Sequence, residues 1–379
     1  MKVTFPHMGN VYVSAKVLFE TAEIEYVIPP LCNKITLSTG IIHSPEFACL
    51  PFKGTLGDFI YGIENGADYI LFGGGCGQCR LGYYGDLHAE ILKDLGYTAR
   101  FIYLDLSNMS IKEAFEKLKP LAEGKRRINI FMGIIYALDM VFRMDNLENL
   151  ARYIRCRENN KGETDRIMKG FEFQVRKVRG YKAVKTLIKS TKRLLKRVEI
   201  DRKARPLRIA LVGEIYAAIE PYFNMELERK LGNLGVEVHN KLSISHWIME
   251  HLIKNMMPFK TKNKPHEAGK EFMKTDDIGG HGLETIGNSV LCGLKKFDGV
   301  IQVYPFTCMP EIIAQSTFSY IQDKYKINIM TLIVDEMTGD TGYATRIEAF
   351  VDMLQRKREI DLTQLRQSPN IQAHMDSVQ

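Results

Sequence analysis

The chain has 379 residues, of which 45% are apolar and 26% are charged, and its net charge is +7. These values describe an ordinary soluble protein with enough residues for two domains of roughly 100 to 200 residues each. The sequence contains no apolar run long enough to cross a bilayer and no secretory signal at its start. We therefore expect a cytoplasmic protein without a membrane partner.

The positive charge is concentrated in residues 161–205, which hold sixteen Lys and Arg against five Asp and Glu. The rest of the chain is mildly acidic. Because apolar residues recur at helical spacing in this segment, we interpret it as solvated amphipathic helices rather than as a nucleic-acid-binding surface. Nucleic acid is accordingly not an expected partner.

The first part of the chain alternates strands and helices. We expect strands at 2–5, 25–28, 67–71 and 99–106, and helices at 13–21, 55–65, 84–95 and 111–121. The segment between the second strand and the second helix is expected to be a loop that carries Cys32 and residues 38–44. Strands that alternate with helices in this way form a parallel, doubly wound sheet.

Strand signals stop between residues 146 and 205 and then return. The second set comprises strands at 207–212, 236–239, 299–304 and 327–334, with helices at 226–234, 246–256, 312–324 and 345–357. The fold class is therefore α/β, with two Rossmann-like parallel-sheet halves joined by a basic helical connector. We divide the chain into an N-terminal α/β domain (1–145), the connector (146–205), a C-terminal α/β domain (206–365) and a loose tail (366–379).

The seven cysteines suggest ligation or reactivity, because the reducing cytosol does not sustain a disulfide framework. Cys76 and Cys79 lie three residues apart in a glycine-rich turn after a predicted strand, where Gly75 and Gly77 allow backbone N–H groups to approach the sulfurs. Two further cysteines, Cys49 and Cys308, are each flanked by prolines in loops. Ligand sites in parallel sheets lie beyond the carboxyl ends of the strands, so these thiols are expected to converge between the halves.

Four thiolates, from Cys49, Cys76, Cys79 and Cys308, fit either a tetrahedral zinc ion or a cubane iron–sulfur cluster. Structural zinc sites usually use two local cysteine pairs, whereas only one pair is local here. We therefore favour the cluster, with a redox dithiol as a weaker alternative. The roles of Cys32, Cys156 and Cys292 stay open.

Acidic and histidine side chains in loops at strand ends are candidate proton donors for a substrate at the cluster: Glu46, Glu214, His281 and Glu311. Glu311 has an alternative structural role as a helix-capping carboxylate, and His281 as a surface turn residue. Neither a dinucleotide-binding glycine motif nor a Walker phosphate loop is present, so no ATP site is predicted on this chain.

The sequence contains three long motifs, Ser-Pro-Glu-Phe-Ala-Cys-Leu-Pro-Phe-Lys, Gly-Gly-Cys-Gly-Gln-Cys-Arg-Leu-Gly-Tyr-Tyr-Gly and Pro-Phe-Thr-Cys-Met-Pro-Glu, with shorter ones at 3–10, 212–216 and 279–282. Together they resemble the acyl-CoA dehydratase activase-related family, often labelled CoA protein activase. The match covers nearly the whole chain. That family is similar to the iron–sulfur subunits of 2-hydroxyacyl-CoA dehydratases and to double-cubane cluster proteins.

The resemblance implies an oxygen-sensitive cluster, either a 4Fe-4S cubane or an eight-iron double cubane, held by Cys49, Cys76, Cys79 and Cys308. It also implies a separate ATP-dependent activase of the actin-like class as the electron donor, an acyl-CoA or other small molecule as the substrate, and a homodimer. The expected function is reductive chemistry or dehydration of a 2-hydroxyacyl-CoA. The alternative is a non-catalytic scaffold that binds zinc.

Overall fold

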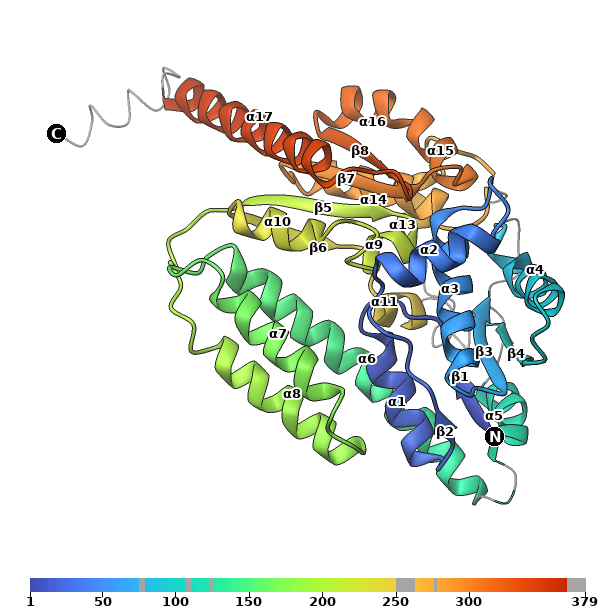
Figure 1. Ribbon diagram of the computed structural model, residues 1–379. Coiled ribbons are helices and arrows are strands. Elements are labelled where there is room, and N and C mark those ends of the chain that lie inside the picture. The colour runs from blue at the N-terminus through green and yellow to red at the C-terminus, as the bar shows by residue number, and fades with distance from the viewer. Residues whose placement is uncertain are drawn as a thin grey trace.

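The computed structural model describes residues 1–74, 79–105, 111–122, 124, 126–249, 263–275 and 278–366. It contains two four-stranded sheets, and all their strands are parallel. The strand orders are β2-β1-β3-β4 and β6-β5-β7-β8, so the two sheets have the same topology. The α/β class with two Rossmann-like halves is therefore confirmed (Figure 1).

The N-terminal half contains the first sheet and the helices around it. Its elements are β1 (Lys2–Thr4), α1 (Val11–Thr21), β2 (Glu25–Tyr26), α2 (Lys34–His43), α3 (Leu50–Glu64), β3 (Tyr69–Gly74), α4 (Leu81–Asp94), β4 (Arg100–Asp105), α5 (Ile111–Leu118) and a 3₁₀ turn (Lys119–Ala122). The chain leaves β1 toward β2 on one side, whereas β3 lies on the other side of β1. The carboxyl ends of β1 and β3 thus form a topological switch point, where doubly wound sheets bind ligands.

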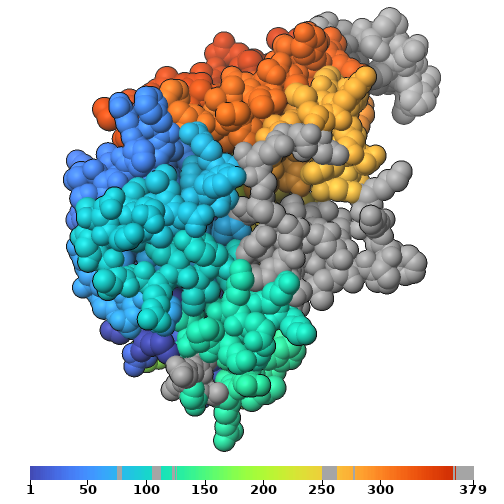
Figure 2. Space-filling view, turned by 90° about the vertical axis from the view of Figure 1, so that its right-hand side faces the viewer, coloured from blue at the N-terminus to red at the C-terminus, as the bar shows by residue number. Residues whose placement is uncertain are grey.

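The C-terminal half repeats this arrangement. It comprises β5 (Leu207–Gly213), α9 (Ile215–Ile219), α10 (Leu227–Asn233), β6 (Val236–Asn240), α11 (Ile244–Ile248), α13 (Lys264–Gly269), α14 (Gly282–Leu294), β7 (Gly299–Pro305), α15 (Met309–Ser316), α16 (Phe318–Tyr325), β8 (Asn328–Val334) and α17 (Asp340–Arg366). Its switch point lies between β5 and β7. In Figure 2 the blue to cyan surface of the N-terminal half meets the orange surface of the C-terminal half.

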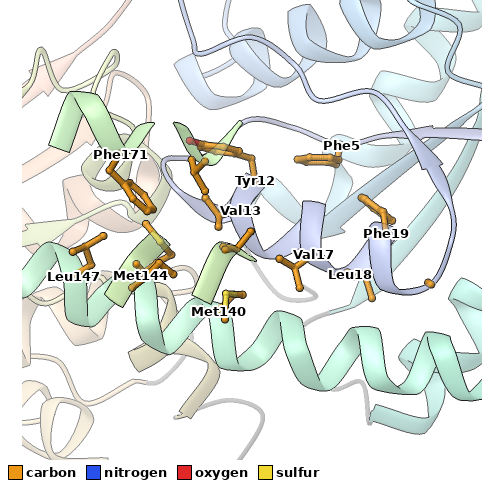
Figure 3. Packing of buried hydrophobic residues seen from close by; sticks show 14 of the residues in the cluster. Phe5, Tyr12, Val13, Val17, Leu18, Phe19, Met140, Met144, Leu147 and Phe171 are labelled. Atoms are coloured by element: carbon orange, nitrogen blue, oxygen red, sulfur yellow. The ribbon is translucent and has the colours of Figure 1, made fainter. Parts of the chain in front are cut away.

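Three helices lead from one half to the other: α6 (Arg127–Arg155), α7 (Glu163–Val175) and α8 (Tyr181–Leu195). Apolar residues of α1 and α6 interdigitate along the length of α1, with Tyr12, Val13 and Val17 facing Met140 and Met144 (Figure 3). Phe171 of α7 closes the same cluster. The connector is helical as predicted, and its first helix also forms part of the N-terminal core.

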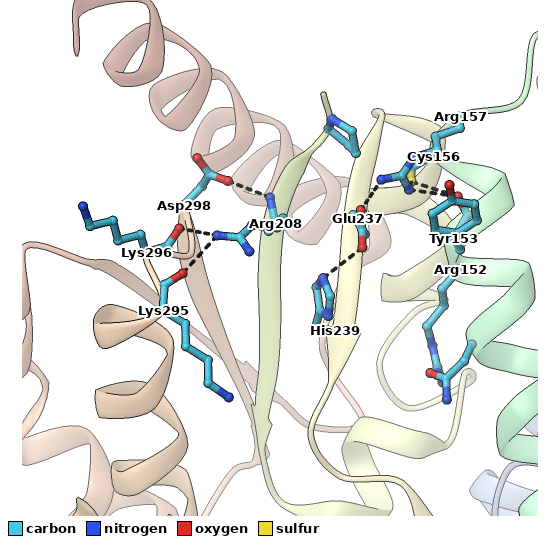
Figure 4. Close-up of polar contacts among 12 residues, drawn as sticks. Arg152, Tyr153, Cys156, Arg157, Arg208, Glu237, His239, Lys295, Lys296 and Asp298 are labelled. Atoms are coloured by element: carbon cyan, nitrogen blue, oxygen red, sulfur yellow. Dashed lines mark hydrogen bonds and ion pairs between the residues drawn. The ribbon is translucent and has the colours of Figure 1, made fainter. Parts of the chain in front are cut away.

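The end of α6 is attached to the second sheet. Arg152 pairs with Glu228 of α10 at 2.6 Å. Arg157, just beyond α6, pairs with Glu237 of β6 (Figure 4). The proposed boundary at residues 145/146 falls inside α6, so this helix belongs to both halves. Within the described ranges, no helix is both long enough and apolar enough to span a membrane.

Two expectations about the first half were wrong in detail. Residues 38–44 were expected in a loop, but residues up to His43 form α2. Asn33 starts this helix by accepting hydrogen bonds from the backbone N–H groups of Ile35 and Thr36. The helix expected at 55–65 begins earlier, at Leu50. Cys49 is therefore the residue that caps α3 rather than a residue within a longer loop.

Candidate functional site

Cys79 and Cys308 occupy equivalent places in the two halves. Cys79 follows β3 and precedes α4, whereas Cys308 follows β7 and caps α15. Because β3 and β7 correspond to each other in the two strand orders, both thiols lie at switch points, as the sequence predicts. The predicted site residues Gly75, Cys76 and Gly77 lie outside the described residues.

Arg80 connects the three described cysteine loops. Its guanidinium donates to the carbonyl of Phe47 at 3.4 Å, and to the carbonyl and hydroxyl of Thr307 at 2.5 and 2.9 Å. Phe47 lies two residues before Cys49, and Thr307 immediately precedes Cys308. Two loops of the N-terminal half and one loop of the C-terminal half therefore meet at this side chain.

Local backbone geometry presents the thiols. Cys49 is extended, with φ −72° and ψ 160°, and Pro51 follows in the first turn of α3. Thr307 has a φ of 72°, which is strained for a β-branched residue, and this strain lies in the loop that positions Cys308. The sulfur of Cys79 lies 3.8 Å from the position a Cβ would take on Gly280, in the turn before α14.

The described thiols lie in an environment that disfavours thiolates in the absence of a cation. Burial raises the pKa of Cys49 to about 11, although a hydrogen bond with the Tyr84 hydroxyl opposes this shift. Burial likewise raises the pKa of Cys79. The pKa of Cys308 is raised by burial and then by the nearby Glu311. Positive charge brought by a metal centre would reverse this preference.

Glu311 is a predicted acid that lies near Cys308 and Cys79. Its carboxyl is 1% exposed and accepts hydrogen bonds from the Thr285 hydroxyl at 3.1 Å and the Gln302 amide at 2.8 Å. Burial raises its pKa to about 8, so it holds a proton near neutral pH. The carboxyl of Glu311 thus accepts from side chains. A helix-capping carboxylate, the alternative role considered from the sequence, would accept from backbone N–H groups.

The other predicted acids have different surroundings. Glu214 caps α9 by accepting from the N–H groups of Tyr216 and Ala217, and burial raises its pKa. His281 precedes α14, next to Gly280. Glu46 is exposed in the turn before Cys49. The structure thus brings Glu214 and Glu311 near the thiols and leaves Glu46 on the outer side of its loop.

The spacing of the described sulfurs bears on the kind of metal centre. At least one pair among the Cys49, Cys79 and Cys308 sulfurs is more than 4.8 Å apart, because they do not form a group within that distance. A single zinc ion with Zn–S bonds of about 2.3 Å needs its sulfurs roughly 4 Å apart. In a cubane each thiolate binds a different iron, so wider spacing is required. As described, the sulfurs of Cys49, Cys79 and Cys308 do not form the close set that one zinc ion needs.

Sequence reasoning missed a second group of donors. His7, Cys32 and Glu220 have their ligand atoms within 4.8 Å of one another, and all three are buried. They line a cavity of about 420 Å³ between the two halves. The position of His7, three residues after β1, could have indicated this site, because it follows a strand at the N-terminal switch point.

A search against protein-family models and a search of curated proteins each found no match to this chain.

Proposed function

We propose that this chain is an iron–sulfur protein of the acyl-CoA dehydratase activase-related family. Its cluster, a 4Fe-4S cubane or an eight-iron double cubane, receives low-potential electrons from a separate ATP-dependent activase. It uses them for reductive chemistry on a small molecule or for dehydration of a 2-hydroxyacyl-CoA. The observation that carries this proposal is the meeting of the Cys49, Cys79 and Cys308 loops, from both halves, at Arg80.

Three features support a redox cluster. The thiols come from separate loops of two domains, whereas a structural zinc ion usually uses two local pairs. Apolar and aromatic residues such as Phe52 and Tyr84 pack around Cys49, which limits water near the sulfur and tunes reduction potential. Glu311, protonated near neutral pH, could supply a proton to a substrate reduced at the cluster.

A surface for the electron donor is also available beside these loops. Phe47, Phe306 and Met309 lie within two residues of Cys49 or Cys308 in the chain and are 77%, 59% and 64% exposed. Large exposed apolar side chains often mark protein-binding surfaces. We propose that the activase docks over them, which would bring its own redox centre close to the cluster.

The test is metal analysis of protein purified strictly without oxygen, followed by electron paramagnetic resonance after reduction. We expect about four or about eight irons per chain, matched by acid-labile sulfide, and a low-potential signal. A Cys76→Ala/Cys79→Ala variant should lose iron, sulfide and signal together. The matched control is Cys156→Ala, which removes a buried thiol at the end of α6 and should retain all three.

The outcomes separate the two candidate functions. Absence of iron in the anaerobic protein overturns the redox proposal. Stoichiometric zinc that disappears in the Cys76→Ala/Cys79→Ala variant would instead support the zinc-binding scaffold. Retention of all iron by that variant would show that the ligands have been assigned to the wrong cysteines.

A further inference from the structure

The donors of the His7–Cys32–Glu220 group converge on one point. The Cys32 sulfur lies 3.9 Å from His7 Nδ1, and a Glu220 carboxylate oxygen lies 3.1 Å from the same nitrogen. In a nucleophilic triad the thiol and the carboxylate contact opposite ring nitrogens, because the imidazole relays a proton between them. Here both the Cys32 sulfur and the Glu220 carboxylate contact Nδ1. This arrangement is the geometry expected of three ligands around a common centre.

The described residues give the carboxyl groups of this site no Lys or Arg partner, although Glu220 lies against His7. His7, Cys32 and Glu220 are 1%, 8% and 2% exposed, and the neighbouring Asp58 is fully buried. Among the described residues, neither Asp58 nor Glu220 forms an ion pair with a Lys or Arg. One oxygen of Asp58 and His7 Nε2 are buried without a hydrogen-bond partner. Two buried carboxyl groups that lack a Lys or Arg partner are costly to ionise, and a bound metal ion would remove that cost.

The surrounding residues hold the donors in place. The backbone N–H of His7 donates to Asp58 at 2.8 Å, and its carbonyl accepts from the Tyr216 hydroxyl. The ring of Tyr12 stacks on the imidazole with centroids 5.3 Å apart. Glu220 is fixed by the N–H of Gly9 at 2.8 Å. Metal ligands are characteristically oriented by outer partners of this kind.

We propose that His7 Nδ1, Cys32 Sγ and Glu220 bind one transition-metal ion, with Zn²⁺ as the occupant, independently of the cluster. Zinc bonds of 2.0 to 2.3 Å in a tetrahedron separate ligand atoms by about 3.3 to 3.8 Å, close to the 3.1 and 3.9 Å observed. Binding releases the thiol proton to solvent and leaves the imidazole proton on Nε2. A fourth position then faces the cavity, as in zinc sites that bind a water or a substrate.

The test measures zinc binding directly, so it needs no enzymatic assay. Apo protein is titrated with Zn²⁺ against a chromophoric chelator, and Co²⁺ is added to detect the sulfur-to-cobalt charge-transfer band. Cys32→Ser and Glu220→Gln, both nearly isosteric, should each weaken zinc binding by about 100-fold or more. Asp58→Asn, which alters only an outer partner, should weaken it by roughly tenfold.

The matched control is Cys292→Ser, which changes a thiol 2% exposed in α14. It should keep wild-type zinc affinity, and circular dichroism should show that every variant is folded. Cys32→Ser should also retain iron and sulfide, whereas Cys76→Ala/Cys79→Ala should retain this zinc. The proposal fails if the wild-type protein binds no zinc tightly, or if folded Cys32→Ser and Glu220→Gln bind it as tightly as Cys292→Ser does.

Discussion

The guanidinium of Arg80 donates a hydrogen bond to the hydroxyl of Thr307, 2.9 Å away, across 227 residues of sequence. This contact joins the loop after β3 to the equivalent loop after β7. Both partners are adjacent to cysteines, so the contact ties together the loops that carry Cys79 and Cys308.

Replacing Arg80 should therefore affect the proposed cluster more than the fold. We expect Arg80→Ala to lose its visible absorbance in air several-fold faster than the wild type, because its cysteine loops are no longer held together. Its free energy of unfolding should change by less than about 1 kcal/mol, since the side chain is exposed. Arg100→Ala, at the start of β4, is the control and should bleach at the wild-type rate. Equal bleaching rates for the two variants would refute the role assigned to Arg80.

A glycine contact brings α2 and α3 unusually close. A Cβ on Gly57 would lie 1.9 Å from the carbonyl oxygen of Thr36, and one on Gly40 would lie 1.7 Å from that of Lys53. We expect Gly57→Ala to lower the free energy of unfolding by about 3 kcal/mol or more, because backbone must move to admit the methyl group. The measurement is urea unfolding.

The control for that variant is Gly170→Ala in α7, where an added Cβ meets nothing within 4 Å. It should raise the free energy of unfolding by about 0.5 to 1 kcal/mol, because alanine favours helix over glycine. Similar effects of the two substitutions would show that the α2–α3 contact is looser than described.

His88 gives the protein a dependence on acid pH. Burial lowers its pKa from 6.5 to about 4, and the ring lies against Phe52 with centroids 4.0 Å apart. As the pH falls, this histidine binds a proton in the unfolded chain before it does so in the folded protein. The stability that neutral His88 contributes is therefore present above about pH 6.5 and is lost toward pH 4. The loss should be about 2 kcal/mol between about pH 7 and pH 5.

His88→Phe retains an aromatic ring and should abolish the part of the pH dependence of the unfolding free energy that comes from His88. His246→Gln, which changes an exposed histidine, should retain the wild-type dependence. Chemical denaturation at several pH values measures both. If the free energy of unfolding changed equally with pH in the wild type and in His88→Phe, a neutral, buried His88 would be contradicted.

Lys53 of α3 forms an ion pair with Glu336, in the loop after β8, and so joins the two halves. The lysine side chain is only 5% exposed, so Glu336→Gln would leave a buried cation without its counter-ion. We expect a loss of about 2 to 3 kcal/mol in the free energy of unfolding. The control is Asp340→Asn, whose carboxylate is 72% exposed, and which should cost less than about 1 kcal/mol. Equal costs would mean that Lys53 reaches solvent.

The alternation of apolar strands and helices was sufficient to predict two parallel sheets, and the positions of Cys79 and Cys308 after strands followed from it. Helix α2 was missed because its residues, mainly Ile, Thr and Gly, have low helix propensity, and its packing against α3 overrides that preference. The His7–Cys32–Glu220 group was missed because 213 residues separate His7 from Glu220. Such a contact depends on how the halves pack, which periodicity does not reveal.

Helix α6 is continuous over 29 residues, or about 44 Å at 1.5 Å per residue. It packs on α1 near one end and on α10 and β6 near the other. A swinging motion of one half away from the other would have to bend this helix or break its ion pairs with Glu228 and Glu237. We therefore expect the chain to unfold in one cooperative transition, and fragments cut at residue 145 to be unable to fold independently.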